Sequence, residues 1–67
     1  MSNLDDIAKE HGIGSVDLGN AVSAIIASRK GSNFEADRYE RGMSRKFTHA
    51  EWEFAHQIAD DYEKRGR

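Results

Sequence analysis

The chain contains no cysteine and no proline among its 67 residues. Without cysteine it forms neither disulfide bonds nor a thiolate zinc site, which are the usual supports of very small proteins. A chain of this length buries only about 60% of the surface that its unfolded form exposes. Its stability must therefore come from an economical core or from a dimer interface, and Trp52, the single tryptophan, is the side chain whose loss we expect to be most damaging.

Long apolar runs are missing as well. No stretch approaches the roughly 20 apolar residues that span a bilayer, and the acidic N-terminus, residues 1–6, is unlike a secretory signal. We therefore expect a cytoplasmic protein with no membrane association.

Catalytic signatures are absent from the sequence too. It has no Ser/His/Asp set at a recognisable spacing, no phosphate-binding glycine loop and no metal motif. A chain this short also has little room to enclose a typical ligand pocket of several hundred Å³ and still keep a core. We interpret the protein as a non-enzyme that uses no cofactor.

Helical periodicity runs through the chain, and no segment alternates apolar and polar residues as a strand does. The pattern predicts an all-α fold: one small helical domain over residues 1–67, built as a compact three- to four-helix bundle with helices at about 4–11, 16–29, 33–41 and 49–64. The second helix carries a broad apolar face and small residues opposite, so we expect it to form the core with the fourth. The first and third are expected to be short outer helices.

The clearest helix start lies at Thr48 and Glu51, which have the spacing of a capping box. Phe47 and Trp52 flank that box at the spacing of a hydrophobic staple. A buried stripe should follow along the fourth helix, formed by Trp52, Ala55, Ile58, Ala59 and Tyr62, with Phe54 at its margin.

Weaker signals mark the other helix ends. Ser2 or Asn3 is the expected cap of the first helix and Ser15 that of the second, while Ser32 should start the third in a capping box with Glu35. Glycines should end three helices, at Gly12, Gly31 and Gly42.

The middle of the chain is basic between two acidic ends. Six lysines and arginines against three acids give residues 29–46 a charge of +3, whereas residues 1–28 sum to −3 and residues 47–67 to −2. A patch in this region would suit phosphates, RNA or an acidic protein surface, although the pI of about 5.8 speaks against a dedicated nucleic-acid binder. The candidate partner-binding residues are Arg38, Tyr39, Arg41, Arg45 and Lys46.

The fourth helix offers an alternative, acidic partner-binding face formed by Glu53, Asp60, Asp61 and Glu63. Such a face either keeps the helix soluble or imitates a nucleic-acid backbone, as some small phage inhibitors of defence complexes do. The same helix carries His49, Glu53, His56 and Asp60 on one stripe. That stripe covers three turns, too far for one ion to gather four ligands, so we expect no metal site.

Residues 7–21 place alanine at Ala8, a glycine turn at Gly12 and apolar residues at Ile13 and Leu18. In these features the segment resembles the helix-turn-helix of DNA-binding proteins. Its second helix, however, would present the acidic Asp17 to phosphate.

The sequence therefore favours a small regulatory or inhibitory protein that binds a larger protein complex, with nucleic acid as a possible component of that complex. A helix-turn-helix-like DNA-binding regulator and a small homo-oligomeric subunit, such as a homodimer, remain the alternatives.

Overall fold

The computed structural model describes residues 4–65, and over those residues it contains helices and no strand. The helices are α1 (Leu4–Glu10), α2 (Ser15–Arg29), α3 (Asn33–Arg41) and α4 (His49–Arg65). The predicted all-α fold is confirmed, and every predicted helix end lies within one residue of the observed one. None of these helices has the length and apolar character needed to cross a membrane.

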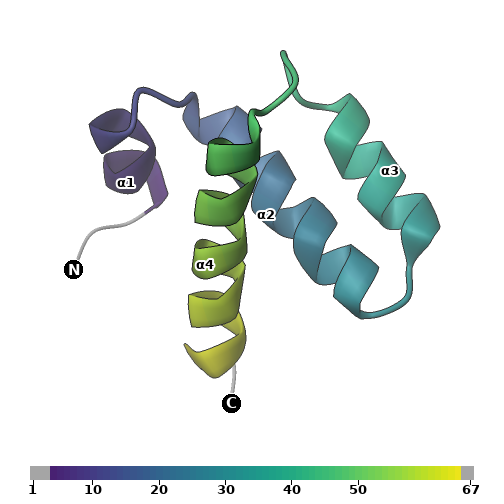
Figure 1. Cartoon of the computed structure of the whole chain (residues 1–67). Coiled ribbons are helices and arrows are strands. Elements are labelled where there is room, and N and C mark those ends of the chain that lie inside the picture. The colour runs from purple at the N-terminus through teal and green to yellow at the C-terminus, as the bar shows by residue number, and fades with distance from the viewer. Residues whose placement is uncertain (1–3, 66–67) are drawn as a thin grey trace.

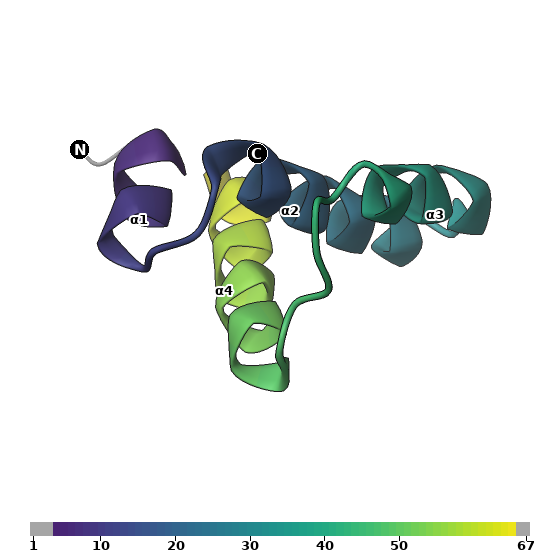
Figure 2. The same cartoon turned by 90° about the horizontal axis from the view of Figure 1, so that it is seen from above.

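The centre of the molecule is α2, which packs against each of the other three helices. The outer helices α1 and α3 lie on opposite sides of the pair formed by α2 and α4 (Figure 1, Figure 2). The backbones of α3 and α4 do not come into contact along their described lengths. Both helices therefore pack against α2, and their backbones are not packed against each other.

The core is formed mainly by one face of α2 against α4, with smaller contributions from α1 and the segment before α4. Leu18 is its only large side chain with no exposed surface. Trp52 is only half-buried at the edge of this core, and Tyr62 is 46% exposed. The prediction of Tyr62 in the buried stripe is therefore wrong. The buried cluster consists of Ala8, Ile13, Leu18, Ala21, Val22, Ile25, Phe47, Ala55, Ile58 and Ala59.

The start of α4 is formed as the sequence predicts. The Glu51 N–H donates to Thr48 Oγ1 at 3.2 Å, and the Thr48 N–H donates to Glu51 Oε1 at 2.9 Å. The rings of Phe47 and Trp52 lie 5.5 Å apart between centroids. These contacts complete the capping box and the hydrophobic staple.

The serine cap predicted for α2 is wrong, and the one predicted for α3 is right in its position but not in its hydrogen bond. Gly14 caps α2, and Ser15 is its first helical residue. Ser32 occupies the cap position of α3 but makes no side-chain cap hydrogen bond. Its N–H donates to the Ala27 carbonyl while Gly31 adopts a φ of +85°, so Ser32 also closes the C-terminal Schellman motif of α2. That motif fixes the backbone of Ser32 away from the geometry of a capping box. The predicted cap at Ser2 or Asn3 lies outside the described residues.

The glycine stops have different physical origins. Gly12, like Gly31, has a positive φ and ends its helix in a left-handed turn. Gly42 follows the last residue of α3 as predicted, but its φ of −77° needs no such freedom. A Cβ atom at Gly42 would lie 3.1 Å from Asn20 Nδ2 on α2. Close packing of α3 on α2 therefore explains the glycine.

The loop between α3 and α4 is tied down at its centre. The buried Asp17 carboxylate of α2 accepts hydrogen bonds from the Ser44 N–H at 2.8 Å and the Ser44 hydroxyl at 2.5 Å. These hydrogen bonds hold the pKa of Asp17 below its ordinary value. Asp17 thus positions the loop that leads into α4.

Candidate functional site

The helix α3 carries the most exposed large apolar side chain among the described residues. None of its nine residues is buried. Phe34 is 76% exposed and Tyr39 is 40% exposed. Arg38 follows Phe34 by one helical turn, and so lies beside it. We call Phe34, Arg38 and Tyr39 the outer face of α3.

The five predicted basic-patch residues are divided by their pairing. Arg41 pairs with Asp37 at 3.1 Å across one turn of α3. Arg45 forms a two-pronged interaction with Glu51, with Arg45 Nη1 at 2.8 Å from Glu51 Oε1, and its guanidinium lies 5.2 Å from the centre of the Phe47 ring. Arg38 and Lys46 make no ion pair within residues 4–65 and are exposed.

Arg45 therefore has a structural role at the start of α4. Its hydrogen bonds, together with the backbone hydrogen bond from Thr48, lower the pKa of Glu51 from 4.5 to about 2. The carboxylate is thus ionised when it completes the capping box. Only part of the predicted basic patch remains available to a partner.

The predicted acidic face of α4 is largely paired as well. Arg29 of α2 reaches Asp60 at 2.7 Å and Glu63 at 3.2 Å, and this pairing raises the pKa of Arg29. Glu53 contacts His49 at 3.1 Å. Asp61 alone of the four acids has no ion-pair partner in the described chain.

The histidines of α4 are engaged with neighbours and do not gather with the acids. His56 Nδ1 lies 3.3 Å from Arg29 Nη2. His49 contacts Glu53, which precedes His56 by about one helical turn. Within residues 4–65, no three His, Asp or Glu side chains lie close enough to hold a metal ion.

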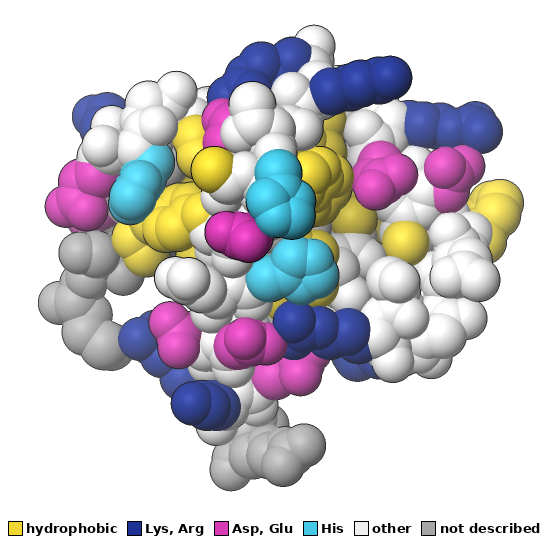
Figure 3. Space-filling view, in the orientation of Figure 1, with side chains coloured by type: hydrophobic (Ala, Val, Ile, Leu, Met, Phe, Trp, Pro, Cys, Tyr) yellow, Lys and Arg dark blue, Asp and Glu magenta, His cyan; other side chains and the backbone are white. Residues whose placement is uncertain are grey.

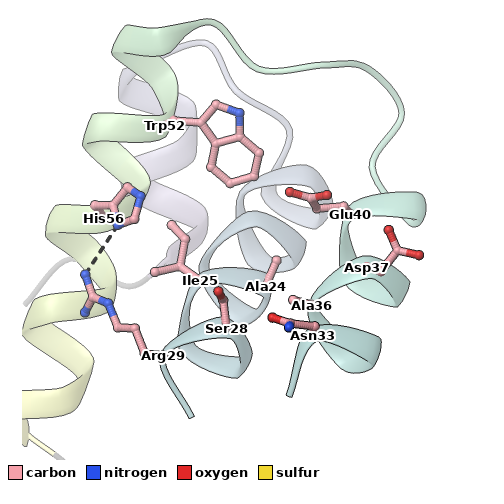
Figure 4. Close-up of a pocket in the computed structure, with 10 residues that line it drawn as sticks. All are labelled: Ala24, Ile25, Ser28, Arg29, Asn33, Ala36, Asp37, Glu40, Trp52 and His56. Carbon is pink, nitrogen blue, oxygen red and sulfur yellow. Dashed lines mark hydrogen bonds between the residues drawn. The ribbon is translucent and has the colours of Figure 1, made fainter. Parts of the chain in front are cut away.

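The space between α3 and α4 forms a surface depression that we call the trough. Its main part has a volume of about 390 Å³. The floor is made by small side chains of α2, Ala24 and Ser28, and one wall by Trp52 of α4 (Figure 4). Asp37 and Glu40 of α3 form the opposite wall (Figure 4).

The trough continues past Trp52 toward the loop before α4. A second hollow of about 360 Å³ shares Trp52, Asp37 and Glu40 with the first. Its other lining residues are Arg41, Met43, Arg45, Lys46 and Phe47. The space-filling view shows apolar surface between α4 and α3, with acidic side chains on the α3 side (Figure 3). No motif in the sequence predicted this site. Its one available signal was the set of small residues on the second side of α2, of which Ala24 lies in the floor of the main hollow.

Comparison with protein-family models, with curated proteins and with solved structures finds no significant match.

Proposed function

We propose that the chain is a regulatory or inhibitory protein without catalytic activity, which binds a larger protein complex through the outer face of α3. The observation that carries this proposal is the exposure of Phe34 on a helix with no buried side chain. Protein interfaces concentrate their binding energy in aromatic and arginine side chains that become desolvated at the centre of the contact. Phe34 and its neighbour Arg38 match that composition.

The charge around this face favours an acidic protein surface. Arg38 has no ion-pair partner among residues 4–65, so a carboxylate on the partner would be its first. The neighbouring Tyr39 supplies an aromatic surface with a polar tip. The proposal includes the cytoplasmic location expected from the sequence.

The helix arrangement supports a protein partner over duplex DNA. A recognition helix needs a free face to enter the major groove, whereas α2 is packed by the three other helices and its Asp17 is engaged by Ser44.

The test is affinity capture from nuclease-treated cell lysate with the tagged chain and two variants. Phe34→Ala should lose the captured protein, whereas Val16→Ala, which removes a 71% exposed side chain outside α3, should retain it. Equal capture by both variants would refute the proposed face. Capture that is seen in untreated lysate and disappears after nuclease treatment would favour the DNA-binding alternative. A mass of two chains by light scattering would favour the homo-oligomeric one.

A further inference from the structure

We propose that the trough is a second binding site, which takes a basic peptide segment of another protein and places an arginine or lysine side chain between Trp52 and Glu40. This site is separate from the outer face of α3, because Phe34 does not line either hollow.

The shape of the trough comes from small side chains below an aromatic wall. Ala24 and Ser28 of α2 and Ala36 of α3 leave the main hollow open, and Trp52 faces them from α4 (Figure 4). Trp52 is half-buried, and its indole N–H donates to no group within residues 4–65. The two hollows of about 390 and 360 Å³ meet at this ring. The trough is therefore long enough for a peptide segment and has an unused donor for a peptide carbonyl.

The charge of the main hollow favours a cationic side chain. The Glu40 carboxylate has no hydrogen-bond or ion-pair partner in the described chain. Asp37 is paired only with Arg41, whose side chain is 80% exposed, so this contact is weak and easily exchanged. On the other side, Arg29 is already neutralised by Asp60 and Glu63. In the main hollow the unpaired charge is thus negative, whereas the second hollow is also lined by the unpaired Lys46.

An aromatic face opposite a carboxylate is a suitable environment for arginine or lysine. The cation is attracted by the ring quadrupole of tryptophan and forms a charge-assisted hydrogen bond with the carboxylate. Nucleic acid would be repelled from the main hollow, because its phosphates would meet Asp37 and Glu40 there. The favoured occupant is therefore a basic segment of a protein.

Peptide binding in the trough can be followed by tryptophan fluorescence. Trp52 is the single tryptophan of the chain, so the whole tryptophan signal comes from the ring that lines the trough. The probe is a synthetic helical peptide of about 15 residues with arginines one turn apart in an alanine and leucine background. The comparison peptide carries glutamine in place of arginine. We expect a saturable change in tryptophan fluorescence with the arginine peptide, and binding about tenfold weaker with the glutamine peptide.

Two variants with equal changes of charge separate the trough from the rest of α3. Glu40→Gln should weaken binding of the arginine peptide about fivefold, whereas Glu35→Gln, on the same helix outside the trough, should leave binding unchanged. Far-UV circular dichroism checks that both variants keep the helical content of the parent chain.

Equal affinities for the two peptides, or equal losses in Glu40→Gln and Glu35→Gln, would overturn the inference. A fluorescence change that follows chain concentration without peptide, together with a doubled mass by light scattering, would show that a second copy fills the trough and would also overturn it. Phe34→Ala should bind the arginine peptide as the parent chain does. Loss of peptide binding with capture through the outer face of α3 intact would therefore refute this site alone.

Discussion

Replacing Leu18 by alanine tests whether this side chain is at the centre of the hydrophobic core. Leu18 has no exposed surface and lies in a cluster with side chains from α1, α4 and the loop before α4. Substitutions of a buried leucine by alanine cost about 2–5 kcal/mol, because apolar contact is lost and a cavity remains. The higher helix propensity of alanine offsets only a few tenths of a kcal/mol.

That loss is large for a chain of this size. At about 0.05–0.15 kcal/mol per residue, the free energy of unfolding should be roughly 3–10 kcal/mol. Each kcal/mol lowers the Tm of a domain this small by about 4–8 °C, so a loss near 3 kcal/mol corresponds to roughly 10–25 °C. Leu18→Ala should be marginally folded or unfolded at room temperature.

The assay is urea unfolding followed by both circular dichroism and tryptophan fluorescence. Val16→Ala is the matched control, because Val16 lies on the same helix but is exposed, and it should change stability by at most about 0.5 kcal/mol. Leu18→Met, which keeps the volume, should cost less than about 1.5 kcal/mol. A loss below about 1 kcal/mol in Leu18→Ala, or a loss equal to that of Val16→Ala, would refute the packing argument.

Three further outcomes follow from the loop and from α3. Because folding lowers the pKa of Glu51 from 4.5 to about 2 through Arg45, the stabilisation is complete above pH 4.5 and is lost as the pH falls toward 2. In a pH series of urea melts, Glu51→Gln should reduce the change in the free energy of unfolding between pH 4.5 and 2. An unchanged pH dependence would contradict the role assigned to Glu51. Asp17→Ala should speed hydrogen exchange at the Ser44 amide, measured by NMR, because its acceptor is removed; unaltered exchange would show that the contact is not maintained. Phe34→Ala should change the free energy of unfolding by at most about 0.5 kcal/mol, because the side chain is 76% exposed, and a larger loss in urea melts would mean that Phe34 is packed.

The start of α4 could be predicted from sequence because every interacting group lies within a few residues. The cap and the staple together need only residues 47–52, and no distant element competes for them. The apolar periodicity of α2 predicted its central place for a similar reason, since a helix with two packing faces requires neighbours on both sides.

Ser32 shows why the same reasoning failed at α3. The motif Ser32 to Glu35 has the spacing of a capping box, but the backbone of Ser32 already completes the end of α2. Because the connection is short, Ser32 belongs to the end of α2 and to the start of α3, and its backbone conformation is set by the end of α2. Predictions from local motifs are therefore weakest where two elements are joined by very few residues.

The trough depends on a contact that local sequence does not contain. Its width is set by how far α4 is held from α3, and the loop that joins them is fixed by Asp17, which lies 27 residues from Ser44. Asp17 looked like an obstacle to phosphate binding in the sequence, and Arg45 looked like part of a basic patch; the structure instead uses both to hold the loop and the first turn of α4. Charges that fix the loop determine where Trp52 stands relative to Glu40. Loosening this loop should therefore alter peptide binding in the trough even when Trp52 and Glu40 are both intact.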